Sequence, residues 1–211
     1  MIRLTIGKEV IPRGLMEVIF FAVALILAIS FGILRLLGSD SIQPNWDNAI
    51  LIDGSYRVLL GQIPHHDFST PIGPLYFAIG AAGMWLSTPT IAGISMGIVF
   101  FGVGLIGLSI YLLRDMPKIF LGLFILILSS YLFTARMLHV SNPVSGGFTG
   151  LYNLYCYCIL FIGSTYLYVC DMKNQDAKEL ISPSALFIAI LLVLSLFIKN
   201  SFGIIFLLMI L

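Results

Sequence analysis

The chain contains very little charge. Only 10% of its 211 residues are Asp, Glu, Lys or Arg, 59% are hydrophobic, and the mean hydropathy is +1.05. Soluble domains carry about 25% charged residues, so the composition predicts an all-α, multi-pass transmembrane helical bundle. The formal net charge is +1 and there is no basic run to follow a phosphate backbone. We therefore do not expect nucleic acid as a partner.

Metal-binding residues are also scarce. The three cysteines, Cys156, Cys158 and Cys170, fall in or at the end of one apolar segment. Residues two apart on a helix do not face each other, so Cys156 and Cys158 are poor partners for a disulfide or a metal. The adjacent residues His65 and His66 could bind zinc, but a zinc site needs three or four convergent ligands. We expect no metal and no cofactor, with a divalent metal as an alternative.

The first hydrophobic segment follows a basic N-terminus. Arg3, Lys8 and Arg13 precede an apolar run of 17 residues from Val18 to Leu34. A signal peptide has a shorter apolar region that ends in a small-residue cleavage site. We therefore interpret the run as a retained transmembrane helix whose N-terminus is cytoplasmic, by the positive-inside rule.

Later hydrophobic segments predict further helices. Residues 68–113 contain no charge, and one helix of that length would measure about 69 Å, over twice the hydrocarbon thickness. A break at Ser87–Thr90 is indicated by its turn residues. The expected helices after the first are 74–86, 91–113, 119–135, 150–170 and 180–198. The apolar run after Lys199 is shorter than the roughly 20 residues of a span, so 1–211 is interpreted as one transmembrane domain, the N-terminal portion of a longer protein.

The sequence leaves two topologies open. If every predicted helix spans, Arg114 and Lys118 lie outside the cytoplasm, against the positive-inside tendency. If residues 74–86 enter the membrane and return, both cations become cytoplasmic. We favour full spanning, because the positive-inside rule is an average that tolerates exceptions.

The chain's polar groups concentrate in residues 39–73, the predicted first extracytoplasmic loop. Four of the ten acids lie here, as do two of the three histidines. Residues 47–60 predict a short amphipathic helix, ended by Gly61 and Pro64. In this interpretation Ile50 and Leu51 face apolar surroundings, whereas Ser55 and Arg57 face water. Such a helix on the membrane surface is the purely structural interpretation of the loop.

The spacing within this loop carries a second interpretation. Gly61 follows Asp47 by fourteen residues, then come Pro64-His65-His66-Asp67-Phe68 and Gly73-Pro74-Leu75. This pattern resembles the first extracytoplasmic loop of GT-C membrane glycosyltransferases, a superfamily that includes protein O-mannosyltransferases and aminoarabinose transferases. The resemblance covers roughly residues 10 to 115. Three positions depart from it: His65 replaces an aromatic residue, Asn48 a second acid, and Leu51 a tyrosine.

The resemblance implies a transferase in a bacterial cytoplasmic membrane. It would move a sugar from a polyprenyl-phosphate donor to a lipid, glycan or protein acceptor, with Asp47 as the general base. Arg57, His65, His66 and Asp67 would bind the substrate, the first three near the departing phosphate. Each residue has a structural alternative, such as helix capping by Asp47 or turn formation by Asp67. As a transferase, this portion of the chain is expected to be inactive by itself. The competing functions are a transporter or flippase-like protein and an inactive membrane fragment of a glycosyltransferase.

Overall fold

The structure is almost entirely helical. The computed structural model describes residues 5–6, 9–10, 12–37, 46–133, 150–172 and 183–210. A short antiparallel pair, β1 (Thr5–Ile6) and β2 (Glu9–Val10), precedes the helices. These are α1 (Arg13–Leu37), α2 (Trp46–Leu59), α3 (Pro74–Leu86), α4 (Ile91–Leu112), α5 (Lys118–Phe133), α6 (Leu151–Met172), α7 (Pro183–Ile198) and α8 (Asn200–Ile210). The helices predicted from sequence are therefore present, and the predicted all-α class is confirmed.

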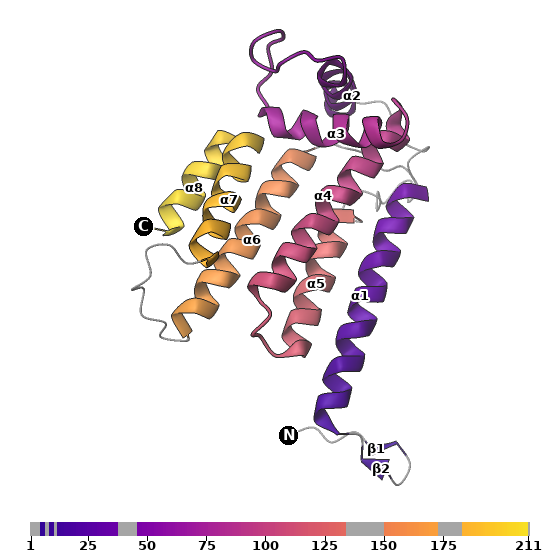
Figure 1. Ribbon diagram of the computed structural model, residues 1–211, viewed down its shortest axis with the longest axis vertical. Coiled ribbons are helices and arrows are strands. Elements are labelled where there is room, and N and C mark those ends of the chain that lie inside the picture. Colours follow the sequence, from indigo (N-terminus) through magenta and orange to yellow (C-terminus); the bar gives the residue numbers. More distant parts are fainter. Residues whose placement is uncertain are drawn as a thin grey trace.

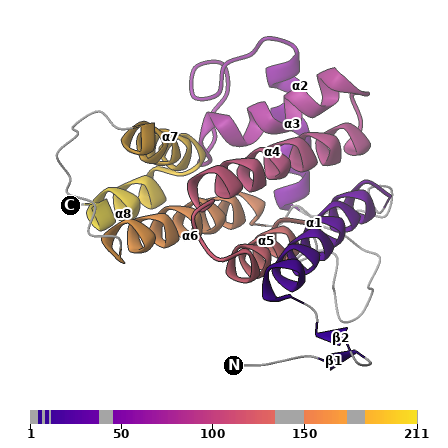
Figure 2. The same ribbon diagram turned by 60° about the horizontal axis from the view of Figure 1, so that its bottom comes forward.

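The helices other than α2 and α3 run roughly along one direction and form the bundle (Figure 1). α6 lies between α5 and the pair α7 and α8, and α1 packs on the other side of α5 (Figures 1 and 2). The strands and the α4/α5 turn lie at one end of the bundle, which we call the N-terminal end. The start of α6 and the α7/α8 corner lie at the opposite end, which we call the upper end (Figure 1).

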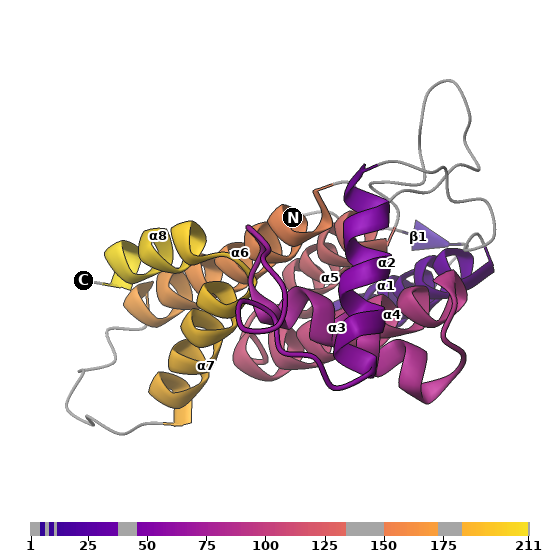
Figure 3. The ribbon, with the colours of Figure 1, turned by 90° about the horizontal axis from the view of Figure 1, so that it is seen from above.

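α2 and α3 lie across the upper end instead of joining the bundle (Figures 1 and 3). The favoured topology has residues 74–86 crossing a membrane, and it stays a prediction; the structure shows that α3 does not run beside the bundle helices (Figure 1). The thirteen residues of α3 make a helix of about 20 Å, shorter than a hydrocarbon core of about 30 Å. The turn from Arg114 to Lys118 lies at the same end of the molecule as the start of α1 (Figure 1).

Close backbone contact between α3 and α4 holds α3 in this position. A Cβ atom on Gly83 would collide with the backbone of Gly93 and Gly97, and a Cβ on Gly97 with the carbonyl oxygen of Ile79. Glycine therefore lets the two backbones approach closely, as small residues do between membrane helices. The turn between the helices is short because α4 starts at Ile91, five residues after α3 ends.

α2 packs on α3 through a second set of small residues. A Cβ on Gly54 would collide with the Phe77 ring, and one on Gly80 would collide with the Ser55 side chain. Ser55 is fully buried, whereas the amphipathic pattern predicted that it would face water. Leu51 is buried as predicted. α2 therefore packs a face of small residues against α3. Gly61, with φ +87°, follows the end of α2 in a backbone conformation that favours glycine.

One continuous core joins the transverse helices to the bundle. It runs from Tyr76 and Phe77 of α3 through Phe133 of α5 to Tyr155 of α6. Among the described residues, Gly14–Leu37 and Ile91–Leu112 are long and apolar enough to cross a membrane, and shorter apolar helices lie beside them. These two helices support association with a membrane.

Candidate functional site

Asp47 lies in the first turn of α2 and reaches the start of α6. Its Oδ2 accepts a hydrogen bond of 2.8 Å from the backbone N–H of Gly150, the residue before α6. An acid in the first turn is favoured by the partial positive charge of a helix N-terminus. Here one carboxylate lies at the start of two helices, its own and α6. The next residue, Asn48, is buried at the position where the resemblance led us to look for a second acid.

Lys199 lies at the corner between α7 and α8. Its Nζ donates a hydrogen bond of 2.9 Å to Asn153 Oδ1 on α6. It also lies 5.1 Å from the centre of the Tyr152 ring and 5.6 Å from that of Phe202. Both distances fit cation–π contacts. These contacts fix a cation on the first turn of α6, at the upper end of the bundle.

The first turn of α6 therefore joins two distant parts of the sequence. Gly150 binds Asp47 from α2, and Asn153 binds Lys199 from the α7/α8 corner. Gly150 and Asn153 are three residues apart, less than one helical turn of about 5.4 Å. The first loop thus supplies a carboxylate, and the end of α7 supplies an ammonium group, to the same region.

A second cation is buried in the same upper part of the bundle. Arg35 of α1 is 4% exposed and its charge lies near Tyr155 of α6 and Tyr76 of α3. The Tyr76 ring also contacts the rings of Tyr152 and Tyr155, with centroids 5.6 and 6.4 Å apart. Burying a charge is costly, so an ionisable group inside an apolar bundle indicates a functional role. Arg35 and Lys199 flank this aromatic group.

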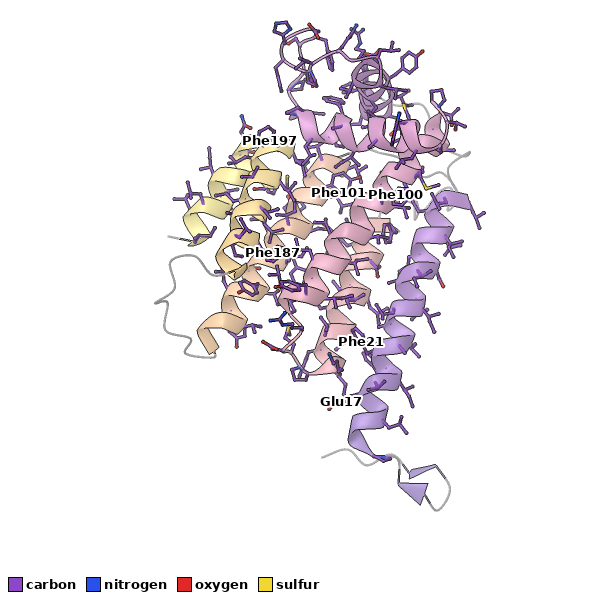
Figure 4. The ribbon with its side chains drawn as sticks, in the orientation of Figure 1. Glu17, Phe21, Phe100, Phe101, Phe187 and Phe197 are labelled. Atoms are coloured by element: carbon purple, nitrogen blue, oxygen red, sulfur yellow. The ribbon has the colours of Figure 1, made fainter. Side chains whose placement is uncertain are left out.

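A cavity opens beside Lys199. Its volume is about 420 Å³, within the range of small-molecule sites. Two segments form it, the chain from Pro71 to Pro74 with His65, and the end of α7 with the start of α8. The amide of Gly73 donates a 3.0 Å hydrogen bond to the carbonyl oxygen of Ile198 and joins these walls. Phe197, one of the lining residues, is seen at the upper end of the bundle in Figure 4.

The turn from Ile63 to Phe68 is organised by Asp67. Asp67 Oδ2 accepts a 2.7 Å hydrogen bond from the backbone N–H of Ile63, and His66 Nδ1 lies 2.7 Å from Asp67 Oδ1. The Ile63 amide and then the His66 ring hold the pKa of the Asp67 carboxyl below its usual value. Both side chains therefore have partners within their own turn. His65 has φ +68°, an uncommon backbone conformation for histidine, and it lines the cavity.

Arg57 is also engaged within the loop. Its Nε donates to Asp53 Oδ2 at 2.8 Å, and its guanidinium lies 5.5 Å from the centre of the Phe68 ring. Arg57 is not among the residues that line the cavity. Of the binding residues expected from sequence, the structure thus brings His65 to the cavity. It places Arg57, His66 and Asp67 in contacts within residues 53–68.

Sequence reasoning missed Arg35 and Lys199. Each carried a signal, because each is a lone cation in or next to a long apolar segment. Within the part of the chain that the structure describes, no three His, Cys, Asp or Glu residues lie together as a possible metal site. Comparison of the chain with protein-family models, curated proteins and solved structures finds no match.

Proposed function

We propose that this protein is a membrane glycosyltransferase that uses a polyprenyl-phosphate sugar donor, with Asp47 as the general base. The observation that carries the proposal is the first turn of α6, which binds Asp47 and Lys199 through residues three positions apart. Sugar transfer from a lipid phosphate needs a proton acceptor for the attacking hydroxyl and positive charge for the departing phosphate. The site supplies one group of each kind, together with buried Arg35.

The shape of the molecule suits a donor whose tail stays in lipid. In this proposal the bundle is a multi-pass membrane domain, and α2 and α3 lie at its extracytoplasmic surface. The N-terminus and the Arg114–Lys118 turn then share the cytoplasmic side, in agreement with the positive-inside rule. Exposed Trp46 and Trp85 of the transverse helices would lie at the interface, where tryptophan is enriched.

Replacement of Asp47 by asparagine tests the proposed base. The oxygen of the new amide side chain can accept the Gly150 N–H bond as Asp47 does, but the amide cannot take a proton. General-base catalysis contributes about 10²- to 10⁴-fold, so we expect Asp47→Asn to lower transfer by about that factor with unchanged folding. The measurement is consumption of radiolabelled polyprenyl-phosphate sugar in membranes that contain the full-length protein.

Asp53→Asn is the matched control. Asp53 lies on the same helix, is exposed, and pairs with Arg57 on the surface. Surface ion pairs contribute little, so this variant should transfer sugar at nearly the parent rate. Near-normal transfer by Asp47→Asn would leave Asp47 with its structural bond to Gly150 alone, and the proposed base would be wrong.

A further inference from the structure

The cavity beside Lys199 has the chemistry of an anion site. The polar residues that line it are His65, Lys199, Asn200 and Ser201, and none of the described lining residues is an acid. Lysine has three N–H donors and Asn153 takes one of them. The residues that line the cavity thus include one lysine, three other polar residues and no acid.

The remaining walls are apolar and lead outward. Ile72, Leu196 and Phe197 line the cavity with the polar groups. The Phe197 side chain is 54% exposed on the outer surface of α7. A ligand with an anionic end and a hydrocarbon end would therefore match both parts of the wall, with its charge at Lys199 and its chain along α7.

We propose that the His65–Lys199 cavity binds the phosphate group of a lipid-linked phosphate, with Lys199 as its counterion. This inference rests on the proposed function, and it assigns the donor phosphate to a residue outside the first loop. Lys199 is suited to the role because Asn153 and the rings of Tyr152 and Phe202 hold its Nζ in place. Asp47 contacts the same end of α6, so a phosphate at Lys199 would leave the attached sugar near the base.

The test measures binding, not turnover. The full chain in detergent micelles is titrated with radiolabelled geranylgeranyl phosphate, an isoprenoid monophosphate that carries no sugar. Geranylgeraniol, which has the same chain without the phosphate, and inorganic phosphate are the competitors. The variants are Lys199→Met, which keeps an unbranched apolar side chain, and Lys199→Arg, which keeps the charge.

Lys118→Met is the matched control. Lys118 lies at the N-terminal end, and its Nζ is 5.6 Å from the centre of the Phe21 ring, the same distance as between Lys199 and Phe202. Removing it changes the net charge equally and also removes a cation–π contact. Any loss shared by both methionine variants would therefore reflect overall charge.

We expect Lys199→Met to weaken binding of geranylgeranyl phosphate about 10- to 100-fold, the effect of losing a hydrogen bond to a charged group. Lys199→Arg should recover most of the affinity, and Lys118→Met should bind like the parent. Geranylgeraniol should compete poorly. Competition by inorganic phosphate at millimolar concentration would show that the phosphate alone suffices, whereas its failure would show that the chain is needed as well.

Equal binding by Lys199→Met and the parent would overturn the proposal, as would equal competition by geranylgeraniol. A Lys199→Arg protein that folds, by its thermal unfolding curve, but does not bind would also count against it. The result of this binding test can be distinguished from the result of the Asp47→Asn transfer test. Loss of binding in Lys199→Met with a silent Asp47→Asn would leave the phosphate site and remove Asp47 as the base, and the reverse pattern would remove only the phosphate site.

Discussion

Replacing Gly97 by alanine should destabilise the contact that keeps α3 across the end of the bundle. The new Cβ would meet the carbonyl oxygen and carbon of Ile79, and it would lie 3.2 Å from the backbone nitrogen of Gly83. These are main-chain atoms of α3, so no side chain can rotate away to make room. Either α3 moves away from α4 or the helices distort.

Gly104→Ala is the reference variant against which the destabilisation by Gly97→Ala is measured. Gly104 lies on the same helix, about two turns further along, and a Cβ there meets nothing within 4 Å. Both substitutions gain the same helix propensity, about 1 kcal/mol. The difference between the variants therefore isolates the overpacking, which costs typically about 1–3 kcal/mol. Because the obstacle at Gly97 is backbone, we expect a value at the upper end of that range.

The assay is reversible unfolding in mixed micelles, followed by tryptophan fluorescence. Both tryptophans, Trp46 and Trp85, lie on the transverse helices, so the signal reports the region under test. We expect Gly104→Ala to unfold at or above the parent midpoint and Gly97→Ala clearly below it. Equal midpoints for the two variants would refute the close packing of α3 on α4.

Two further predictions concern the sidedness of the chain and the turn held by Asp67. Single cysteines are introduced at Gln62 and at Asp115 in a cysteine-free background and treated with a membrane-impermeant maleimide. The cysteine at Gln62 should react in intact cells, and the one at Asp115 only after lysis. Reaction of both in intact cells would support the topology in which residues 74–86 span the membrane. Asp67→Ala should speed hydrogen exchange at the Ile63 amide, which donates to Asp67. The pKa of Asp67 is lowered in the folded protein. In the parent, the Ile63 amide should therefore be fully protected from exchange above the ordinary pKa of aspartate, about 4, and lose protection as the pH falls below it. Protection of this amide that does not change with pH would contradict the assigned hydrogen bond.

The helices of this chain can be predicted from sequence because long apolar runs and their breaks are local signals. The expected second helix, 74–86, is the observed α3, and Gly61 ends α2 as its position indicated. The orientation of α3 is not a local property. It follows from the contact of Gly83 and Gly97 with a neighbouring backbone, and sequence shows the glycines without showing which helix they will meet.

Part of the candidate site could likewise be predicted from the sequence, and part of it could not. Asp47 and His65 stand out in sequence because polar residues are concentrated near them, and the structure places His65 at the cavity and Asp47 at α6. Asp67 was predicted either as a binding residue or as a turn former; it accepts a hydrogen bond from Ile63 within the turn, and its binding role stays a prediction. Lys199 is far from His65 in sequence, and nothing local indicates that both line one cavity.

The two buried or half-buried cations are better explained by function than by stability. A well-packed apolar side chain often stabilises a core as much as a buried ion pair does, or more, because desolvation of the charges is costly. Arg35 is nonetheless almost fully buried, and Lys199 is the only charged residue between Pro183 and Ile210. Both lie at the end of the bundle that α2 and α3 cover, where a ligand can reach Lys199 without crossing the apolar core. Lys199 is half-buried beside a cavity of about 420 Å³, and the lipid-linked phosphate proposed above would supply its counterion.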